Sequence, residues 1–137
     1  MGEFLVNNIA LVALFLASGV MLVWPELSRL AGGAAAIGTL DATRLMNQPG
    51  TLVLDVREDG EFAAGHLPRA KSIPLRELDK RLDEISKFKD KPVIVTCRTG
   101  ARSAAACRAL KRAGFGNVQN LSGGFSAWTQ ASLPVEK

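Results

Sequence analysis

Residues Pro92-Val93-Ile94-Val95-Thr96-Cys97-Arg98-Thr99-Gly100-Ala101-Arg102-Ser103 are the most informative part of this chain. The apolar run over residues 92–96 predicts a short buried strand, and the alanine-rich run after the loop predicts a helix. A cysteine between a strand and a helix lies where backbone N–H groups converge and where the helix dipole is positive. Both effects favour the thiolate over the thiol, and the two arginines add to this preference. The pattern therefore predicts a nucleophilic sulfur at Cys97 and an anionic substrate.

This loop and four further motifs resemble one known family. The segment from Cys97 to Arg102 is similar to the active-site loop of rhodanese-type sulfurtransferases, which reads Cys-Arg-x-Gly-x-Arg/Thr. The other motifs follow in the family's order: Asp55-Val56-Arg57, Glu61-Phe62-Ala63-Ala64-Gly65-His66-Leu67-Pro68, Ser72-Ile73-Pro74-Leu75 and Gly123-Gly124-Phe125-Ser126-Ala127-Trp128. The resemblance covers residues 39–135, with a departure at Arg69, where the family usually has glycine.

The resemblance implies both a fold and a chemistry. The implied fold is α/β, a small, mainly parallel sheet with helices on both faces. The implied reaction has two steps, in which the Cys97 thiolate attacks the outer sulfur of a donor and a second thiophile then removes that sulfur from the persulfide. Donors in the family include thiosulfate, mercaptopyruvate and protein persulfides, and acceptors include cyanide and thiols. No cofactor is expected.

The residues that follow the cysteine are expected to bind the substrate. The backbone N–H groups of Thr99, Gly100, Ala101 and Arg102 are expected to cradle the persulfide or a donor anion, and Gly100 allows a positive φ without steric cost. The side chains of Arg98 and Arg102 are interpreted as charges that act on the substrate or the loop, with ordinary solvated charges as the alternative. A carboxylate beneath the loop would be another partner for Arg102.

Three further residues are expected to support the site. Asp55 and Arg57 end a strand at the active edge and are predicted to form structural ion pairs rather than to do chemistry. His66 is the only histidine and could form a triad with Cys97, but the resemblance implies that it stabilises a turn.

Cys107 lies on an apolar helical stripe, which predicts core packing, with a resolving thiol as the alternative.

Strands and helices alternate along residues 39–137, which predicts a parallel sheet covered on both faces. Strands are predicted over residues 51–56, 93–96 and 118–121, the second of them central. Helices are predicted over residues 41–46, with Asp41 as the cap, and over 58–64, 75–88, 102–113 and 125–130. In such sheets ligands bind beyond the carboxyl ends of the strands, which is where Cys97 is expected to lie.

The N-terminal residues are apolar enough for a membrane anchor. Residues 9–24 carry no charge. A helix over residues 4–24 would be roughly 31 Å long at about 1.5 Å per residue, enough to cross a hydrocarbon core of about 30 Å. A cleaved signal peptide is the alternative, but the N-terminus lacks the basic residues typical of one.

These features predict three segments. Residues 1–25 form a transmembrane anchor that contacts the lipid bilayer through residues 4–24, and Pro25 is expected to break the helix. Residues 26–38 form a flexible Ala/Gly linker. Residues 39–137 form the rhodanese-like domain.

The composition limits the remaining function classes. The chain has 137 residues, a formal net charge of +4 and two cysteines. Nucleic-acid binding is not expected, because aromatic residues do not interleave with the basic ones. The cysteines make neither a disulfide framework nor a zinc-ligand pattern, and a reactive thiol indicates a reducing compartment.

Charge and chemistry together predict a single-pass protein of the bacterial inner membrane with a cytoplasmic catalytic domain. Glu3 precedes the apolar segment, whereas Arg29 and Arg44 follow it, and basic residues favour the cytoplasmic side. A persulfide-forming thiol also needs a reducing compartment.

Two alternative functions use the same features. Phosphatases of the dual-specificity type share the implied fold but need a longer loop, Cys-x5-Arg. Cys97 and Arg102 are spaced Cys-x4-Arg, which suits the smaller sulfur. The other alternative is a membrane-anchored interaction module that assists membrane-protein partners, although such modules often lack the cysteine that this chain keeps.

Overall fold

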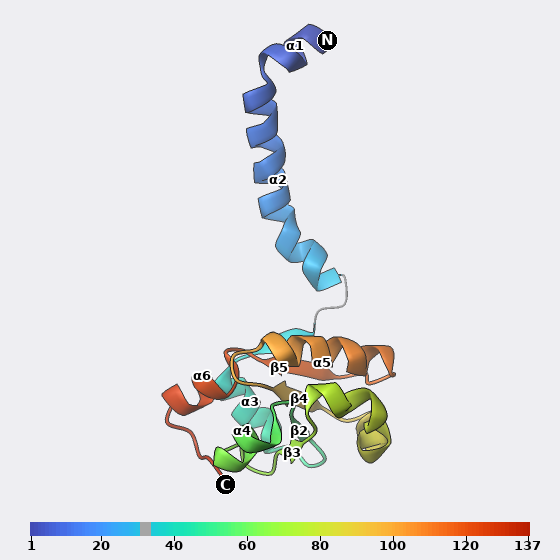
Figure 1. Cartoon of the computed structure of the whole chain (residues 1–137), viewed down its shortest axis with the longest axis vertical. Coiled ribbons are helices and arrows are strands. Elements are labelled where there is room, and N and C mark those ends of the chain that lie inside the picture. The colour runs from blue at the N-terminus through green and yellow to red at the C-terminus, as the bar shows by residue number, and fades with distance from the viewer. Residues whose placement is uncertain (31–33) are drawn as a thin grey trace. The chain divides into compact units, whose positions relative to one another are not determined.

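The computed structural model describes residues 1–30 and 34–137. Contacts divide the chain into two units, Met1–Gly32 and Gly33–Lys137. In its described part the first unit consists of the helices α1 (Gly2–Asn7) and α2 (Ile9–Leu30), which Figure 1 shows in blue. Asn8 separates them with φ −118° and ψ 25°, and its side chain donates a hydrogen bond to the Phe4 carbonyl at 2.9 Å.

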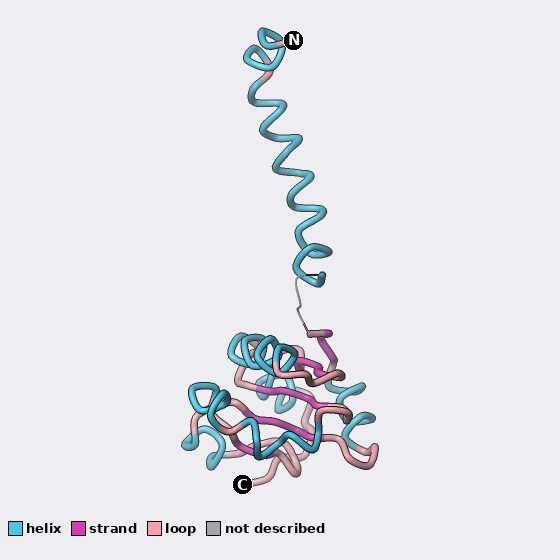
Figure 2. The backbone as a smooth tube through the Cα atoms, turned by 90° about the vertical axis from the view of Figure 1, so that its right-hand side faces the viewer, coloured by secondary structure: helices cyan, strands magenta, loops and turns pink. Residues whose placement is uncertain are grey.

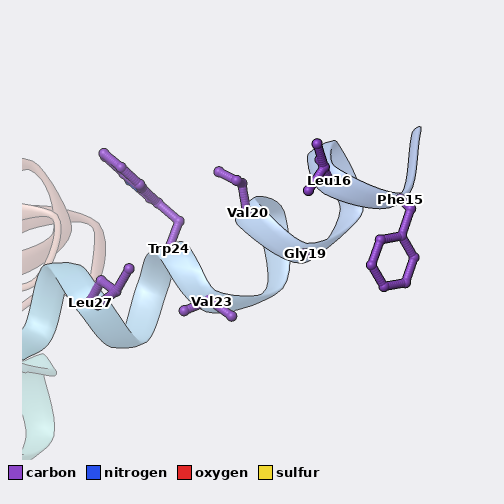
Figure 3. A pocket seen from close by; sticks show the side chains of 7 residues that line it. All are labelled: Phe15, Leu16, Gly19, Val20, Val23, Trp24 and Leu27. Carbon is purple, nitrogen blue, oxygen red and sulfur yellow. The ribbon is translucent and has the colours of Figure 1, made fainter. Parts of the chain in front are cut away.

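The apolar part of α2 agrees in length and composition with a membrane-spanning helix. Residues Ile9–Leu27 have a mean hydropathy of 2.0, and none of this segment is buried. It is the one helix among the described residues that is long and apolar enough to cross a membrane. One side of the helix carries a shallow apolar hollow (Figure 3), which is lined by Phe15, Leu16, Gly19, Val20, Val23, Trp24 and Leu27.

Two expectations for this region are wrong. Pro25 does not end the helix, because α2 continues through it to Leu30. A proline inside a helix removes a hydrogen bond, and the helix-favouring Glu26 and Leu27 directly after it support continuation. The expected flexible linker over residues 26–38 also differs at both ends, since α2 occupies residues 26–30 and a strand occupies residues 35–37. Residues 31–33 lie outside the described part of the chain.

The second unit is built on a parallel sheet. Within its described residues the strand order is β1-β5-β4-β2-β3, and every pairing is parallel. Figure 2 shows these strands in magenta between the helices. The strands are β1 (Ala35–Ile37), β2 (Leu52–Asp55), β3 (Lys71–Ser72), β4 (Val93–Thr96) and β5 (Val118–Leu121). As predicted, β4 is central, and it is buried along its whole length.

Helices cover both faces of the sheet. They are α3 (Thr39–Met46), α4 (Asp59–Ala64), α5 (Ala101–Arg112), α6 (Gly124–Gln130) and two 3-10 helices, η1 (Leu75–Lys80) and η2 (Leu82–Phe88). Val93 and Val95 belong to a hydrophobic cluster that includes buried residues of α5, η1 and η2. Ile94 belongs to a second cluster that includes buried residues of α3 and α6. This alternation follows from the two-residue period of a strand and confirms the predicted α/β layers.

The apolar spacing over residues 75–88 produces two 3-10 helices rather than one α-helix. They meet at Arg81, whose φ of −115° and ψ of 14° are not helical. Leu78 and Ile85 are buried, as the spacing predicts. Apolar residues spaced three or four positions apart fit either kind of helix, so periodicity alone does not distinguish them.

Local pattern also missed the two edge strands, β1 and β3. Each is very short, and each is held by pairing with a distant strand, β1 with β5 and β3 with β2. The small residues of β1 therefore resembled a linker. Asp41 lies in the first turn of α3 rather than at its N-cap, which is Gly38.

Candidate functional site

Cys97 is the first residue after the central strand. It is only 1% exposed and belongs to the same hydrophobic cluster as Val93 and Val95. Because side chains alternate along a strand, this register directs its sulfur towards the face covered by α5. The expected position, at the carboxyl end of a parallel strand and before a helix, is confirmed.

The Cys97 sulfur lies within hydrogen-bond distance of two groups at the start of α5. Its Sγ lies 3.0 Å from the amide nitrogen of Gly100 and 3.3 Å from Oγ of Ser103. Burial raises the pKa of the thiol, but hydrogen bonds from the Ser103 hydroxyl and from the amides of Ser103, Gly100 and Thr99 lower it by more. The net result is a pKa below the ordinary value of a thiol.

Gly100 makes this loop geometry accessible. It is the N-cap of α5 and has a φ of 113°, in the left-handed region that favours glycine. The expected positive φ is confirmed. The hydrogen bonds that lower the pKa of the thiol come from Thr99, Gly100 and Ser103, and the sequence pattern did not indicate Ser103. Ala101 and Arg102 begin α5, and their amides remain predicted donors to a bound substrate.

Arg102 is held by a carboxylate, which was one of the partners expected for it. Its guanidinium donates to both carboxylate oxygens of Glu61, at 2.7 and 3.0 Å. The hydrogen bond from Arg102 lowers the pKa of Glu61 to about 2. Glu61 also accepts a hydrogen bond from the Glu58 amide in a capping box of α4. The ion pair therefore joins the start of α5 to α4.

Asp55 and Arg57 form the predicted structural ion pair. Nε of Arg57 lies 3.0 Å from Oδ1 of Asp55 and NH2 lies 2.8 Å from Oδ2, with both side chains almost fully buried. The same NH2 group donates to the Gly65 carbonyl at 2.7 Å, and the guanidinium stacks 4.3 Å from the centre of the Phe125 ring. Arg57 thus connects β2, the end of α4 and α6.

His66 supports a turn, as the resemblance implied. Its Nδ1 lies 2.9 Å from the Phe62 carbonyl oxygen, and its ring stacks on the Phe62 ring at 3.8 Å. Its backbone pairs with Glu136 through two hydrogen bonds of 2.9 Å. These contacts bind the C-terminal tail to the end of α4 rather than directing the imidazole at the sulfur.

Arg69 explains why this turn usually has glycine. Its φ is 61°, in the left-handed region, where a side chain is strained. Arg69 holds the conformation through its amide, which donates to Oε2 of Glu136 at 3.1 Å, and through NH2, which donates to the Met46 carbonyl at 2.8 Å. These two hydrogen bonds hold Arg69 in a conformation that glycine would adopt without strain.

The first turn of α6, which follows a pair of glycines, binds the backbone of the Cys97 loop. The Phe125 amide donates to the Cys97 carbonyl at 2.7 Å, and the Ser126 amide donates to the Arg98 carbonyl at 3.0 Å. Gly124 has a φ of 58°, and a Cβ atom placed on it would lie 2.8 Å from the Arg98 carbonyl oxygen. The loop backbone therefore approaches α6 more closely than any side chain would permit.

A surface hollow of about 340 Å³ borders the loop. Its lining residues are Arg57, Glu61, Ala64, Gly65, Arg98, Phe125, Ser126 and Thr129. Arg57 and Glu61 are already neutralised by their ion pairs, whereas Arg98 is exposed and has no ion-pair partner among the described residues. Arg98 therefore gives this hollow a net positive charge, which suits an anionic substrate.

Cys107 belongs to the core, as predicted. It is fully buried in α5, and burial raises the pKa of its thiol to about 12. The two cysteines are both free. Among the described residues, no cluster of three or more His, Cys, Asp and Glu side chains could hold a metal ion.

The contacts of the sulfur predict an unusual titration. We expect the rate of iodoacetamide alkylation of Cys97 to rise with pH to a plateau, with a midpoint clearly below about 8.5, the ordinary value for cysteine. Cys107 serves as the internal control and should remain unmodified. The ion pair of Glu61 is intact throughout this pH range, because its pKa is about 2. A midpoint of 8.5 or higher would show that the loop does not stabilise the thiolate.

Comparison with known proteins agrees with this geometry. The family model of the rhodanese-like domain matches residues 39–131. The chain belongs to the rhodanese-like family. A sulfurtransferase of Allochromatium vinosum is 40% identical over 92 residues, which are 67% of this chain and 84% of that protein. The family assignment confirms the fold expected from the loop and its accompanying motifs.

Solved structures show the same rhodanese fold. A rhodanese-related protein of Thermoplasma volcanium has a TM-score of 0.67 and 31% identity, over 74% of this chain and 97% of that chain. Thiosulfate sulfurtransferase of Pseudomonas aeruginosa has a TM-score of 0.67 and 26% identity, over 76% of this chain. This match spans only 19% of the Pseudomonas chain. The family model and these relatives identify the chain as a rhodanese-type sulfurtransferase.

Proposed function

We propose that this protein moves a sulfane sulfur from a donor such as thiosulfate to a thiophilic acceptor through a persulfide on Cys97. The observation that carries the proposal is the buried Cys97 sulfur, which faces the Gly100 amide at 3.0 Å and the Ser103 hydroxyl at 3.3 Å. These donors stabilise a thiolate without a separate general base.

The first step forms the persulfide. The Cys97 thiolate attacks the outer sulfur of thiosulfate, a bond forms between the two sulfurs, and the bond to the inner sulfur breaks. Sulfite leaves with the electron pair, and Cys97 carries the terminal sulfur as an anion. Amide donors around the loop and the positive charge of Arg98 stabilise this negative charge. No oxidant or reductant is consumed.

The second step returns the enzyme to its starting state. A thiophile such as cyanide or a thiolate attacks the terminal sulfur, and the sulfur–sulfur bond breaks with its electrons on Cys97. Arg102 and Arg57 position this site rather than take part in bond making, because each is already held by a carboxylate. The buried Arg57–Asp55 pair fixes the floor of the hollow, and the Arg102–Glu61 pair fixes its α4 wall.

We also propose that residues 4–24 tether the sulfurtransferase to the bacterial inner membrane, with the catalytic domain in the cytoplasm. The exposed apolar segment Ile9–Leu27 supports the tether. The basic residues after it and the need of a free thiol for a reducing compartment support the orientation.

This orientation has a direct test. Protease added to sealed, right-side-out spheroplasts should leave residues 39–137 intact, because the membrane shields a cytoplasmic domain, and lysis should expose them. The fragments are followed by immunoblotting, with a periplasmic and a cytoplasmic protein as controls. Digestion before lysis would place the domain on the outer side.

The activity itself is tested by steady-state kinetics. Full-length protein in detergent, supplied with thiosulfate and cyanide, should form thiocyanate and sulfite in equal amounts. Initial-rate patterns should be those of a ping-pong reaction, because the donor product leaves before the acceptor binds. Failure to form thiocyanate with thiosulfate and with organic persulfide donors would contradict the proposed function.

A further inference from the structure

Asn120 on β5 forms hydrogen bonds with Gly100 and Ser103, the two residues that contact the Cys97 sulfur. Its Nδ2 donates to the Gly100 carbonyl at 3.2 Å, and its Oδ1 lies 2.6 Å from Oγ of Ser103. Ser103 is fully buried, and its Oγ also lies 3.0 Å from the Gly100 carbonyl oxygen and 3.3 Å from Sγ. One amide side chain therefore holds both the loop backbone and the hydroxyl beside the nucleophile.

The Ser103 hydroxyl has more neighbouring acceptors than it has protons. A hydroxyl carries one hydrogen, whereas Asn120, the Gly100 carbonyl and an ionised Cys97 could each accept it. The distance to Asn120 Oδ1 is the shortest of the three. When Cys97 is a neutral thiol, the Ser103 hydrogen therefore points at Asn120, and the thiol hydrogen of Cys97 can point at a free lone pair of Ser103.

We propose that Asn120 is a positioning residue for sulfur transfer. Its Oδ1 accepts a hydrogen bond from the Ser103 hydroxyl when the Cys97 sulfur is a thiol or a persulfide. When the sulfur is a thiolate, the hydroxyl donates to the sulfur instead. Only the O–H bond rotates, and the hydroxyl keeps its proton throughout. This role rests on the persulfide chemistry proposed above.

The Ser103 hydroxyl has a different hydrogen-bonding role in each state of the Cys97 sulfur, which are the thiol, the thiolate and the persulfide. A thiolate needs a donor, so the hydroxyl turns towards Sγ. In the persulfide the charge moves to the outer sulfur, and the inner Sγ becomes a weak acceptor. A buried hydroxyl without a good acceptor is costly, so the hydrogen returns to Asn120. Asn120 thus favours the uncharged states of Sγ, including the intermediate.

A double-mutant cycle tests this role in the full-length protein. Asn120→Leu, Ser103→Ala and the double variant are compared by the pH midpoint of Cys97 alkylation. A second readout is the lifetime of the added sulfur after thiosulfate is removed, followed by intact mass without an acceptor. Gln119→Leu, at the neighbouring position of β5, is the matched control. Asn120→Ala replaces Asn120→Leu if leucine prevents folding, and Ser103→Thr retains a hydroxyl for the rescue.

The two single variants should shift the pH midpoint of Cys97 alkylation in opposite directions. Asn120→Leu should lower the midpoint by about 0.5 pH unit and shorten the sulfur lifetime several-fold. In the thiol and the persulfide the Ser103 hydrogen then loses its nearest acceptor, at 2.6 Å, and keeps only the more distant Gly100 carbonyl at 3.0 Å. Ser103→Ala should raise the midpoint, and the double variant should match Ser103→Ala, because Asn120 acts through Ser103. Ser103→Thr should keep the wild-type midpoint.

Two results would overturn the role. A raised midpoint in Asn120→Leu would show that Asn120 only stiffens the loop, and additive shifts in the double variant would show that it does not act through Ser103. Absence of any added sulfur in the wild-type protein would instead contradict the proposed function, while the alkylation cycle would still report on Asn120.

Discussion

Cys97→Ser should reduce thiocyanate formation by at least about 1,000-fold, because a serine hydroxyl cannot accept and release a sulfane sulfur. The fold should survive the change, since serine is smaller than cysteine and can still accept the hydrogen bond that the Gly100 amide donates at 3.0 Å. Far-ultraviolet circular dichroism and the melting temperature would report folding, and thiocyanate colorimetry would report activity.

Cys107→Ala is the matched control for this variant. Its thiol is buried in α5, and its pKa of about 12 keeps it protonated. The variant should therefore retain most of the activity. Thiocyanate formation by a folded Cys97→Ser protein would contradict the assignment of the nucleophile, and complete loss in a folded Cys107→Ala protein would show that the second thiol takes part.

Gly124→Ala should displace the catalytic loop. The new Cβ would lie 2.8 Å from the Arg98 carbonyl oxygen, and the φ of 58° would add backbone strain. Strain and overpacking together predict a loss of about 1–3 kcal/mol in the free energy of unfolding. Because the Phe125 and Ser126 amides bind the carbonyls of Cys97 and Arg98, we also expect kcat/KM for thiosulfate to fall by at least about tenfold.

Gly60→Ala provides a matched glycine control. Gly60 lies in α4, and a Cβ atom there would meet nothing within 4 Å. Urea unfolding and thiosulfate kinetics of both variants would separate the close approach at Gly124 from a general effect of replacing glycine. Wild-type stability and activity in Gly124→Ala would contradict the clamp between α6 and the loop.

The centre of the fold could be predicted because its signals are local. The apolar run over residues 93–96 predicted β4 with its observed bounds, and the loop after it predicted the position of Cys97. The alternation of strand and helix predicted the parallel layers. The paired glycines matched a family motif, and the structure gives the physical reason, which is the close approach of α6 to the Cys97 loop.

The contacts around the sulfur could not be predicted in the same way, because they join residues far apart in the sequence. Glu61 and Arg102 are 41 positions apart, and Ser103 and Asn120 are 17 positions apart. Ser103 directly follows the loop motif in the sequence, so its place there could have indicated a contact with the sulfur. Nothing in the pattern around Asn120 indicates that it reaches the loop. The edge strands were missed for the same reason, since distant partners define them.

Sulfur loading identifies the residue that carries the transferred sulfur. Full-length protein is treated with thiosulfate, freed of excess donor and analysed by intact mass and peptide mapping. We predict the added mass of one sulfur atom, located on Cys97, absent from Cys107 and removed by cyanide. A protein that gains no sulfur from thiosulfate or an organic persulfide, or that carries it on Cys107, would contradict the claim that Cys97 is the sulfur-carrying nucleophile.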